Sequence, residues 1–186
     1  MARREDESVL IGGFEKAPIR IVDYDPSWPT QYQAHAKKIA RALGDVSLRI
    51  EHIGSTSVPG LAAKPIIDIL VVVTDSADED SYLPKLEAAG YELRVREPEF
   101  YEHRMLRTPT KDAHIHVFSP GSPEIFRFLT FRDRLRTNAE ERKRYEDTKR
   151  RLAAQSWPDM NAYAEAKTDI VESILAAAII DGQESR

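Results

Sequence analysis

One stretch of the chain decides the fold, residues 53–73, which read Ile53-Gly54-Ser55-Thr56-Ser57-Val58-Pro59-Gly60-Leu61-Ala62-Ala63-Lys64-Pro65-Ile66-Ile67-Asp68-Ile69-Leu70-Val71-Val72-Val73. Its end, 66–73, is a run of aliphatic and mostly β-branched residues without polar alternation, which predicts a central strand covered on both faces. Its start is rich in glycine, serine and proline, and it follows a segment, 47–53, whose alternation predicts another strand. The pattern therefore predicts two strands joined by a turn of small residues.

Asp68 is the residue of this stretch that the strand pattern does not explain. A carboxylate within an apolar strand is costly to bury unless it is paired or bound to a metal ion. One interpretation is that Asp68 handles a cation. The alternative is that it braces the turn by accepting hydrogen bonds from Ser55, Lys64 or Arg132.

The turn before Asp68 has the composition of a phosphate-binding loop. Gly54 lets the backbone approach a ligand closely, and the residues after it offer N–H and hydroxyl groups to phosphate oxygens, namely Ser55, Thr56 and Ser57. The turn is not a Walker loop, because Gly60 is followed by Leu61 where that motif requires lysine. We therefore do not expect a P-loop kinase.

The rest of the chain alternates between strand and helix patterns and then becomes helical. The expected strands are 19–22, 91–95 and a hairpin of 101–106 with 114–118, and the expected helices are 30–43, 82–89, 124–136, 138–155 and 159–180. The patterns predict an α/β fold, with a small mixed β-sheet flanked by helices and a C-terminal helical segment. The expected divisions are a flexible leader over 1–16, the α/β core over 17–121 and the helical segment over 122–182.

Composition restricts the class of protein. Of 186 residues, 41% are hydrophobic and 31% are charged, as in ordinary globular proteins, and the net charge is −4. Net acidity disfavours a dedicated nucleic-acid binder, which needs a basic surface. The chain has no cysteine, no apolar run long enough to span a bilayer and no signal-peptide core at its start, so we expect a cytoplasmic protein without a membrane partner.

Basic residues gather in the helical part of the chain. Residues 124–151 contain ten Lys/Arg and six Asp/Glu. Arg132 falls on the apolar stripe of its helix and Arg136 lies about one turn further, so the two guanidinium groups form a fork suited to a polyphosphate. The alternative is that Arg132 forms an ion pair that bridges the helix to the core.

Two Tyr/Lys pairs stand four residues apart on the later helices, Tyr145 with Lys149 and Tyr163 with Lys167. A tyrosine can stack on a base or bind a hydroxyl, and a lysine can neutralise a triphosphate, so both pairs are candidates for nucleotide binding. The alternative is simple packing, with the lysine stem against the ring and the amine in solvent.

His114 and His116 lie two residues apart on an expected strand, so their side chains point to the same face. Imidazole suits Zn²⁺, Mn²⁺, Fe²⁺ or Ni²⁺ better than Mg²⁺. A metal site formed with Asp68 is one interpretation, and hydrogen bonding to phosphate or to neighbouring carboxylates is the other. His35 and His103 are interpreted as ordinary surface or helix-face residues.

Four segments together closely resemble the GrpB-like family. They are 51–69, 114–118, 131–136 and Asp23-Tyr24-Asp25-Pro26-Ser27-Trp28-Pro29. The resemblance runs in the same order from about residue 19 to residue 178. It implies a branch of the nucleotidyltransferase superfamily, with the polymerase-β-like fold, in a family that also occurs fused to dephospho-coenzyme A kinase in some bacteria.

In that superfamily a Gly-Ser turn precedes a strand bearing Asp-x-Asp or Asp-x-Glu, and a third carboxylate lies on a later strand. The resemblance places Gly54 and Ser55 at the turn and Asp68 at the first carboxylate. The second position is Leu70, which cannot bind a metal ion. The resemblance therefore implies one weakly held Mg²⁺ or Mn²⁺ in place of the usual pair.

Residues and resemblance together predict a nucleotidyltransferase-like enzyme that binds a nucleoside triphosphate, ATP above all. It would transfer a nucleotidyl group to a small-molecule acceptor, and the activation of a carboxylate for ligation belongs to that class. The expected catalytic residues are Asp68, Lys64 and Arg132, and the expected metal ligands are Asp68, His114 and His116. The expected nucleotide-binding residues are His52, Gly54, Ser55, Thr56, Ser57, Arg136, Tyr145, Lys149, Tyr163 and Lys167.

Two other functions remain open. One is a nucleotide- or coenzyme-binding module without activity, which Leu70 favours because it removes the second metal-binding carboxylate. The other is a metal-dependent hydrolase that uses the two histidines and Asp68. The sequence predicts no oligomeric state.

Overall fold

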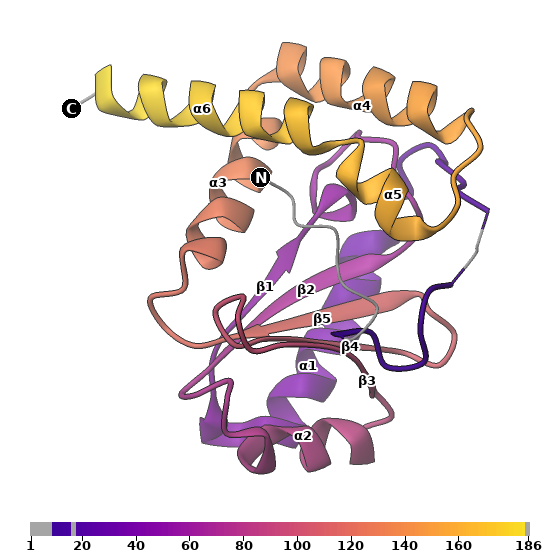
Figure 1. The fold of residues 1–186 in the computed structure, drawn as a ribbon. Coiled ribbons are helices and arrows are strands. Elements are labelled where there is room, and N and C mark those ends of the chain that lie inside the picture. Colours follow the sequence, from indigo (N-terminus) through magenta and orange to yellow (C-terminus); the bar gives the residue numbers. More distant parts are fainter. Residues whose placement is uncertain (1–8, 16–17, 185–186) are drawn as a thin grey trace.

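The computed structural model describes residues 9–15 and 18–184. Its described residues form one five-stranded mixed sheet in the order β1-β2-β5-β4-β3, shown in Figure 1. The strands β2 and β5 are parallel, and the other neighbours are antiparallel. The bounds are β1 Ser47–Ile53, β2 Ile67–Val73, β3 Glu92–Glu97, β4 His103–Arg107 and β5 Ala113–Phe118.

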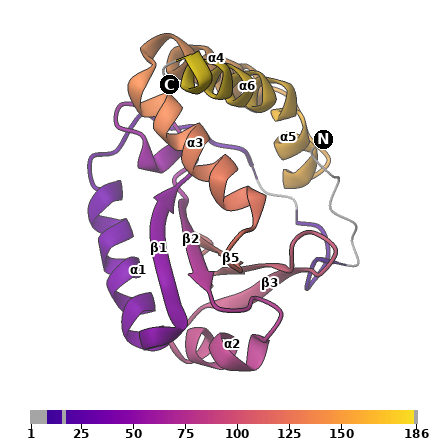
Figure 2. The same ribbon diagram turned by 90° about the vertical axis from the view of Figure 1, so that its left-hand side faces the viewer.

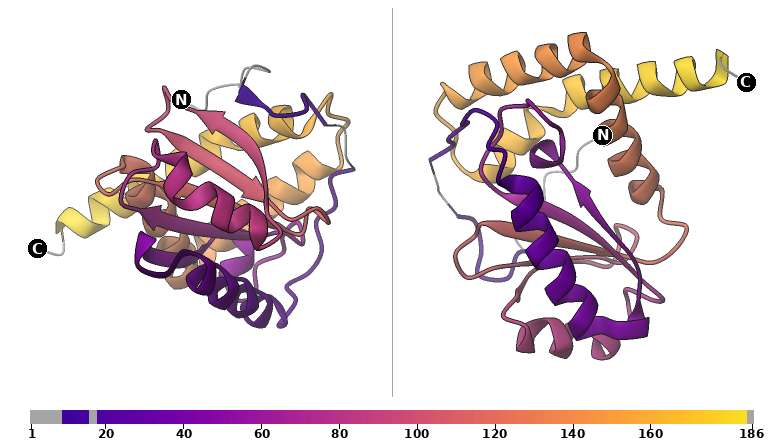
Figure 3. Two further views of the ribbon diagram at one scale, coloured as in Figure 1. Left: turned by 90° about the horizontal axis from the view of Figure 1, so that it is seen from below. Right: turned by 180° about the vertical axis from the view of Figure 1, so that it is seen from behind.

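Two helices cover one face of this sheet, α1 (Trp28–Leu43) and α2 (Glu79–Ala88). Figure 3 shows α1 lying across the strands in the view from behind. Their buried side chains pack on the odd-numbered residues of β2 and β5, Ile67, Ile69, Val71, Val73, Ala113, Ile115 and Val117. Because side chains alternate along a strand, the even-numbered residues of β2, Asp68 among them, face the other side.

That other face is covered by α3 (Pro123–Thr137), as the view in Figure 2 makes visible. Here Leu70, Val72 and Phe118 are buried, and three side chains of α3 pack on them, Ile125, Phe128 and Leu129. The strand β2 is therefore covered on both faces, as its uninterrupted apolar run predicts. Asp68 lies at the start of β2, at the edge of this second apolar cluster.

The remaining helices close one end of the molecule. They are α4 (Ala139–Ala153), α5 (Met160–Glu165) and α6 (Thr168–Glu184), and α4 and α6 lie side by side in Figures 1 and 2. The prediction of one helix over 159–180 is wrong at its start, because the Lys167 N–H bonds to the Ala164 carbonyl in a tight turn. Lys167 consequently lies between two helices and not on one.

Near its start the chain runs along the sheet. Leu10 forms a bridge to Val95 and is buried, and Glu15 pairs with Arg107 and Lys111. Part of the predicted leader, residues 9–15, therefore contacts the core. The other residues of the predicted leader, 1–8 and 16, lie outside the described residues.

The strand predicted over 19–22 is reduced to a single bridge between Val22 and Ala63, close to the breakers Pro18 and Pro26. The predicted fold class is nevertheless confirmed, with a small mixed sheet, flanking helices and a C-terminal helical segment. None of the described helices combines the length and the apolar composition that a membrane crossing requires.

Candidate functional site

Asp68 and Gly54 form the centre of the site. In the sheet, Asp68 is the partner of Ile53 on β1 and of His114 on β5, so its carboxylate lies beside the residue that follows β1. Gly54 has a φ of 68°, and a Cβ placed on it would lie 2.3 Å from the Asp68 Oδ2 atom. Both the left-handed backbone and the close carboxylate require glycine at this position.

Two histidines of β5 stand beside the same carboxylate. The His114 Nδ1 atom lies 3.5 Å from Asp68 Oδ1, and the His116 Nε2 atom lies 3.9 Å from it. One ligand atom from each of the three side chains lies within 4.8 Å of those of the other two, and all three side chains are partly exposed. The predicted set of metal ligands is therefore brought together, with one oxygen and two nitrogen donors.

The charge of Asp68 follows from these neighbours. Burial acts to raise the pKa of this carboxyl, but the interactions with His114 and His116 outweigh it and hold the pKa below its usual value. Asp68 is accordingly an anion at neutral pH. The next inward position, Leu70, is fully buried, so β2 supplies a single carboxylate, as expected from the sequence.

The interpretation of His103 as a surface or helix-face residue is wrong. It lies on β4, is 6% exposed, and its ring stacks between Phe118 and His116. Its Nδ1 atom is 2.7 Å from Glu97 Oε2 and its Nε2 atom is 3.1 Å from His116 Nδ1. Burial lowers the pKa of His103, against the opposing effect of Glu97, so the ring is neutral at neutral pH.

The turn after β1 folds as a short 3₁₀ segment, η3 (Ser55–Ser57), and most of its side chains serve the turn itself. The Ser57 hydroxyl donates to the Gly54 carbonyl at 2.6 Å, and the Thr56 hydroxyl donates to the Ile66 carbonyl at 3.1 Å. Both residues are buried. Their predicted role as side-chain ligands of phosphate is not supported, because the hydroxyl protons are already used.

His52 likewise acts inside the fold. It is buried, its Nε2 atom lies 3.1 Å from the Thr56 hydroxyl, and its ring stacks on Tyr32. Burial lowers the pKa of His52 to about 4, so it is neutral at neutral pH. The structure therefore gives His52 a bracing position under the turn in place of the predicted contact with a nucleotide.

Lys149 reaches the same turn from α4. It is only 2% exposed, it donates to the Ser55 hydroxyl at 3.0 Å and to the Ala62 carbonyl, and its ammonium lies 4.7 Å from the centre of the Tyr145 ring. Burial, together with the charge of Lys167, lowers the pKa of Lys149 to about 7. The predicted Tyr145/Lys149 pair is thus directed inward and not toward solvent.

Lys64 and Lys167 complete a group of three amines. Their ammonium groups lie 5.4 Å and 4.8 Å from the centre of the Tyr163 ring. Burial lowers the pKa of Lys64, and burial with the charge of Lys64 lowers the pKa of Lys167 to about 7. The field of Asp68 reaches both amines. The buried Tyr163 hydroxyl has no hydrogen-bond partner among the described residues.

The guanidinium fork predicted for polyphosphate is not part of this group. Arg132 donates to Glu51 and to the His52 carbonyl of β1, at 2.8 Å and 3.1 Å, and also to Asp133. Arg136 donates twice to the Ser57 carbonyl, at 2.9 Å and 3.1 Å. Arg132 is engaged by Glu51, Asp133 and the His52 carbonyl, whereas the Arg136 side chain is 37% exposed and lines a surface depression. The expected roles of Arg132 in catalysis and of Arg136 in nucleotide binding stay predictions.

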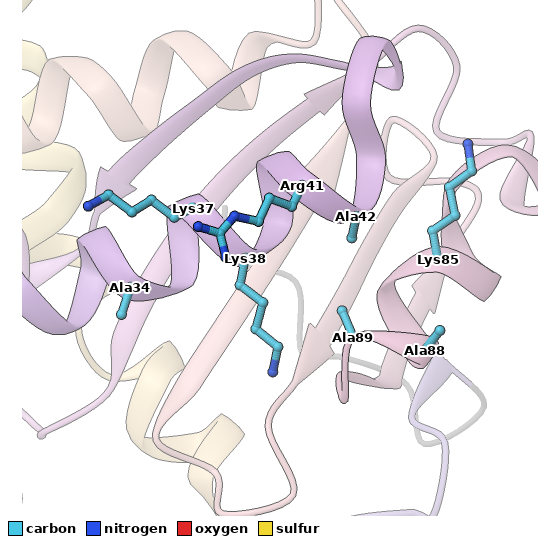
Figure 4. A pocket seen from close by; sticks show the side chains of 8 residues that line it. All are labelled: Ala34, Lys37, Lys38, Arg41, Ala42, Lys85, Ala88 and Ala89. Atoms are coloured by element: carbon cyan, nitrogen blue, oxygen red, sulfur yellow. The ribbon is translucent and has the colours of Figure 1, made fainter.

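Two surface depressions lie away from Asp68. One, of about 570 Å³, is on the outer side of the turn, lined by Tyr32, His52, Ser57 and Arg136 among others. The larger, of about 700 Å³, lies between α1 and α2 on the opposite face of the sheet, with Lys37, Lys38, Arg41 and Lys85 around a floor of alanines (Figure 4). The larger depression holds no carboxylate, hydroxyl or imidazole for chemistry, so it is not the candidate active site.

The described groups around Asp68 can therefore do two things. The carboxylate and the two imidazoles present a donor set for one divalent cation, and the amines of Lys64, Lys149 and Lys167 present positive charge beside it. This combination suits a ligand with several negative charges that also binds metal ions.

These features define a small α/β protein with a mixed sheet, in which a Gly-Ser turn faces a carboxylate on the next strand. This is the arrangement that the sequence analysis expected from the resemblance to the GrpB-like family. The chain belongs to the GrpB family, since the family profile described as "GrpB protein" matches residues 18–177.

Relatives agree with this assignment. UPF0157 protein BH1888 of Halalkalibacterium halodurans is 50% identical over 94% of this chain and 90% of its own length. A dephospho-CoA kinase of Mycolicibacterium paratuberculosis is 31% identical over 82% of this chain, which corresponds to 44% of that protein.

Among solved structures, GrpB from Enterococcus faecalis matches with a TM-score of 0.79 at 34% identity, covering 88% of this chain and 99% of that one. A fainter likeness is to the Cid1 poly(U) polymerase, with a TM-score of 0.46 at 13% identity over 70% of this chain and 45% of that one, from which no activity follows.

Proposed function

We propose that the protein binds a nucleoside triphosphate at Asp68 and transfers its nucleotidyl group to a small-molecule acceptor. The observation that carries this proposal is the group of three amines beside one carboxylate. Lys64 and Lys167 are half-buried, neither makes an ion pair within the described part of the chain, and their partial burial lowers both pKa values. Buried cations are costly unless an anion compensates them. A triphosphate supplies that compensation.

We propose a role for each of these residues in holding the nucleotide. The Ser55 hydroxyl accepts a hydrogen bond from Lys149, so these two side chains would hold phosphate oxygens together. Lys64 and Lys167 would neutralise the outer phosphates, and the partnerless hydroxyl of Tyr163 could bind the nucleotide. In this proposal Lys64 and Lys167 have the charge-stabilising role predicted for Arg132.

The reaction is a substitution at the α-phosphorus. A carboxylate or deprotonated hydroxyl oxygen of the acceptor forms a bond to this phosphorus, the bond to the bridging oxygen breaks, and pyrophosphate leaves with the electron pair. Charge that grows on the leaving group is met by the amines of Lys64, Lys149 and Lys167. A carboxylate acceptor needs no general base, which agrees with the lack of an evident base.

A divalent cation fits the donor set of Asp68, His114 and His116. Bound there, it would polarise phosphate oxygens as a Lewis acid. Two imidazoles with one carboxylate suit Mn²⁺ or a later transition metal better than Mg²⁺, which prefers oxygen ligands. We therefore propose Mn²⁺ as the more effective of the two ions predicted from the sequence.

We propose that the nucleotide is ATP, that the acceptor is a small molecule and not a nucleic acid, and that the reaction takes place in the cytoplasm. The net charge of −4 supports an acceptor other than a nucleic acid, and the lack of cysteine supports the cytoplasm. A second function is a binding module without turnover, and the buried Leu70 at the second carboxylate position favours it.

Release of pyrophosphate tests the proposal. The protein is incubated with each of the four nucleoside triphosphates, Mn²⁺ or Mg²⁺ and a pool of small metabolites, and Asp68→Asn serves as the matched variant. We expect the wild-type protein to release pyrophosphate with Mn²⁺. We expect Asp68→Asn to abolish this release while its free energy of unfolding stays unchanged. Nucleotide binding without any release would support the binding module, and release of orthophosphate alone would support a hydrolase. Release that survives Asp68→Asn would contradict the proposed mechanism.

A further inference from the structure

We infer that Arg107 and Lys111 form a second anion subsite on the Asp68 face of the sheet, which binds a carboxylate of the acceptor. Glu15 occupies this subsite until the acceptor displaces it. The inference rests on the proposed function and deepens it, because it names the chemistry of the acceptor. None of the three residues that form this contact belongs to the site predicted from the sequence.

The sheet register places Arg107 beside the candidate metal ligands. Asp68 on β2 is the direct partner of His114 on β5, and His114 is in turn the direct partner of Arg107 on β4. Directly paired residues extend their side chains from the same face of a sheet. Because neighbouring strands lie about 4.8 Å apart, the backbones of Asp68 and Arg107 are separated by about 10 Å. A small acceptor can bridge this separation.

Two cations converge on the Glu15 carboxylate. Arg107 donates from Nη1 to Oε2 and from Nη2 to Oε1, each at 2.9 Å. The Lys111 ammonium donates to Oε2, also at 2.9 Å. This paired geometry is the one in which a guanidinium recognises a carboxylate or a phosphate. The subsite therefore already holds a carboxylate, and Glu15 stands in the place of a ligand.

The fold positions both cations without help from Glu15. Arg107 is the last residue of β4, and its side chain is only 16% exposed. Lys111 lies in the turn between β4 and β5, where its N–H bonds to the Thr108 carbonyl at 2.9 Å. The Thr108 hydroxyl accepts from the Ala113 N–H at 3.1 Å, which ties this turn to β5. A preorganised pair of cations pays little ordering entropy when it binds an anion.

Glu15 can leave the subsite without disturbing the core. Its side chain is 32% exposed and that of Lys111 is 53% exposed, so a carboxylate from solvent reaches the same place. The buried residue of the segment, Leu10, lies earlier in the chain. Glu92 is the other cross-strand partner of Arg107, but it makes no ion pair with Arg107 within the described part of the chain. Release of Glu15 therefore opens the subsite to a ligand.

The test removes this tethered carboxylate, because a tethered group competes at an effective concentration in the millimolar range. Glu15→Gln keeps the size of the side chain but not its charge, and Glu15→Gln with Arg107→Met also removes the guanidinium. Glu79→Gln is the matched control, since Glu79 likewise holds two arginines, Arg96 and Arg104, and Arg104 lies on the opposite face of the sheet. Each protein is titrated calorimetrically with glutarate alone and with inorganic phosphate alone.

We expect Glu15→Gln to bind glutarate at least about tenfold more tightly than the wild type, because charge-assisted hydrogen bonds become available to it. The double variant should lose this gain, and Glu79→Gln should show none. An equal gain in Glu79→Gln would mean that any opened arginine pair binds carboxylates, and this would overturn the inference. The absence of a gain in Glu15→Gln, or tighter binding of phosphate than of glutarate, would also overturn it.

Release of pyrophosphate from ATP and Mn²⁺ tests the link to the acceptor separately. The concentration of the metabolite pool that gives half the maximal rate should fall in Glu15→Gln and rise in Arg107→Met, while the maximal rate stays nearly the same. If neither variant changes this concentration, the subsite does not serve the acceptor and the inference is overturned. Glutarate binding as expected, with no pyrophosphate from any of the proteins, would contradict the proposed function and still support the carboxylate subsite.

Discussion

Gly54 and Asp68 act as one unit at the scale of single residues. The turn must pass so close to the carboxylate that a side chain on Gly54 would collide with it, at 2.3 Å from Oδ2 and 3.0 Å from the Asp68 Cβ. The contact keeps Asp68 directed at His114 and His116. Gly54 therefore sets the position of the carboxylate as well as the shape of the turn.

The substitution Gly54→Ala should consequently displace Asp68. We expect it to lower the free energy of unfolding by about 1–3 kcal/mol and to abolish Mn²⁺ binding, because the carboxylate must move and the backbone is strained. Urea denaturation and a Mn²⁺ titration measure the two effects.

Gly60 supplies the control for this prediction. It has a similar φ, 76°, but a Cβ placed on it meets no atom within 4 Å. Gly60→Ala should therefore show the backbone strain alone, with Mn²⁺ binding intact. Equal loss of Mn²⁺ binding in both variants would show that turn strain, and not the displacement of Asp68, is responsible.

The lowered pKa of Lys149, about 7, makes the stability of the ligand-free protein depend on pH. The unfolded state has the ordinary lysine pKa of 10.5, so between pH 7 and pH 10 it binds more protons than the folded state does. The free energy of unfolding should therefore rise with pH across this window, by up to about 1.4 kcal/mol per pH unit from this residue. Below pH 7 both states are charged and the dependence ends.

Lys149→Met removes this contribution, so the variant should be more stable than the wild type at pH 7 and should approach it toward pH 10. Lys143→Met on the same helix is the matched control, because Lys143 is exposed and pairs with the exposed Asp147. Chemical denaturation at a series of pH values gives the slope of the free energy of unfolding against pH for each protein. Identical slopes for wild type and Lys149→Met would show that Lys149 is charged and compensated within the protein.

At the scale of secondary-structure elements, Arg132 joins α3 to β1. Its bonds to Glu51 and to the His52 carbonyl link the helix to the strand that leads into the turn. We expect Arg132→Met to lower the free energy of unfolding by about 1–3 kcal/mol, since Glu51 is left partly buried with Arg49 as its remaining ion-pair partner among the described residues. Nucleotide affinity should change less than twofold.

Arg49→Met removes the exposed ion-pair partner of Glu51 and should lower the free energy of unfolding by less than about 1 kcal/mol. Thermal or urea denaturation together with an ATP titration separates the two roles. A large loss of nucleotide affinity with unchanged stability in Arg132→Met would restore the guanidinium to the nucleotide site.

The elements themselves could largely be predicted from the sequence, because apolar periodicity reports which residues share a face. The same periodicity placed Arg132 on the inner face of its helix but could not show that Glu51, on a strand far away in the chain, would be its partner. The break at Lys167 was missed because the residues around it, Ala166 and Thr168, interrupt no helical pattern. His103 was missed since its burial depends on rings from a neighbouring strand.

At the scale of the whole molecule, the candidate site exists only where distant segments meet. The turn and Asp68 come from the sheet, Lys149 comes from α4, and Lys167 comes from the junction of α5 and α6. The sequence could nominate these residues from their chemistry and from a family resemblance. It could not show that three lysines would gather without an ion pair to any described carboxylate, because that depends on how the C-terminal helices close over the sheet.

The measurement that tests this account most directly is calorimetric titration of ATP with Mn²⁺ into two double variants of equal charge change. Lys149→Met with Lys167→Met removes two amines of the site, and Lys37→Met with Lys38→Met removes two cations from the larger depression of Figure 4. We predict that the first double variant stays folded and loses at least about 100-fold in affinity, which is about 2.7 kcal/mol, while the second changes less than about threefold. Equal losses in both, or a loss confined to the second, would contradict the placement of the triphosphate beside Asp68.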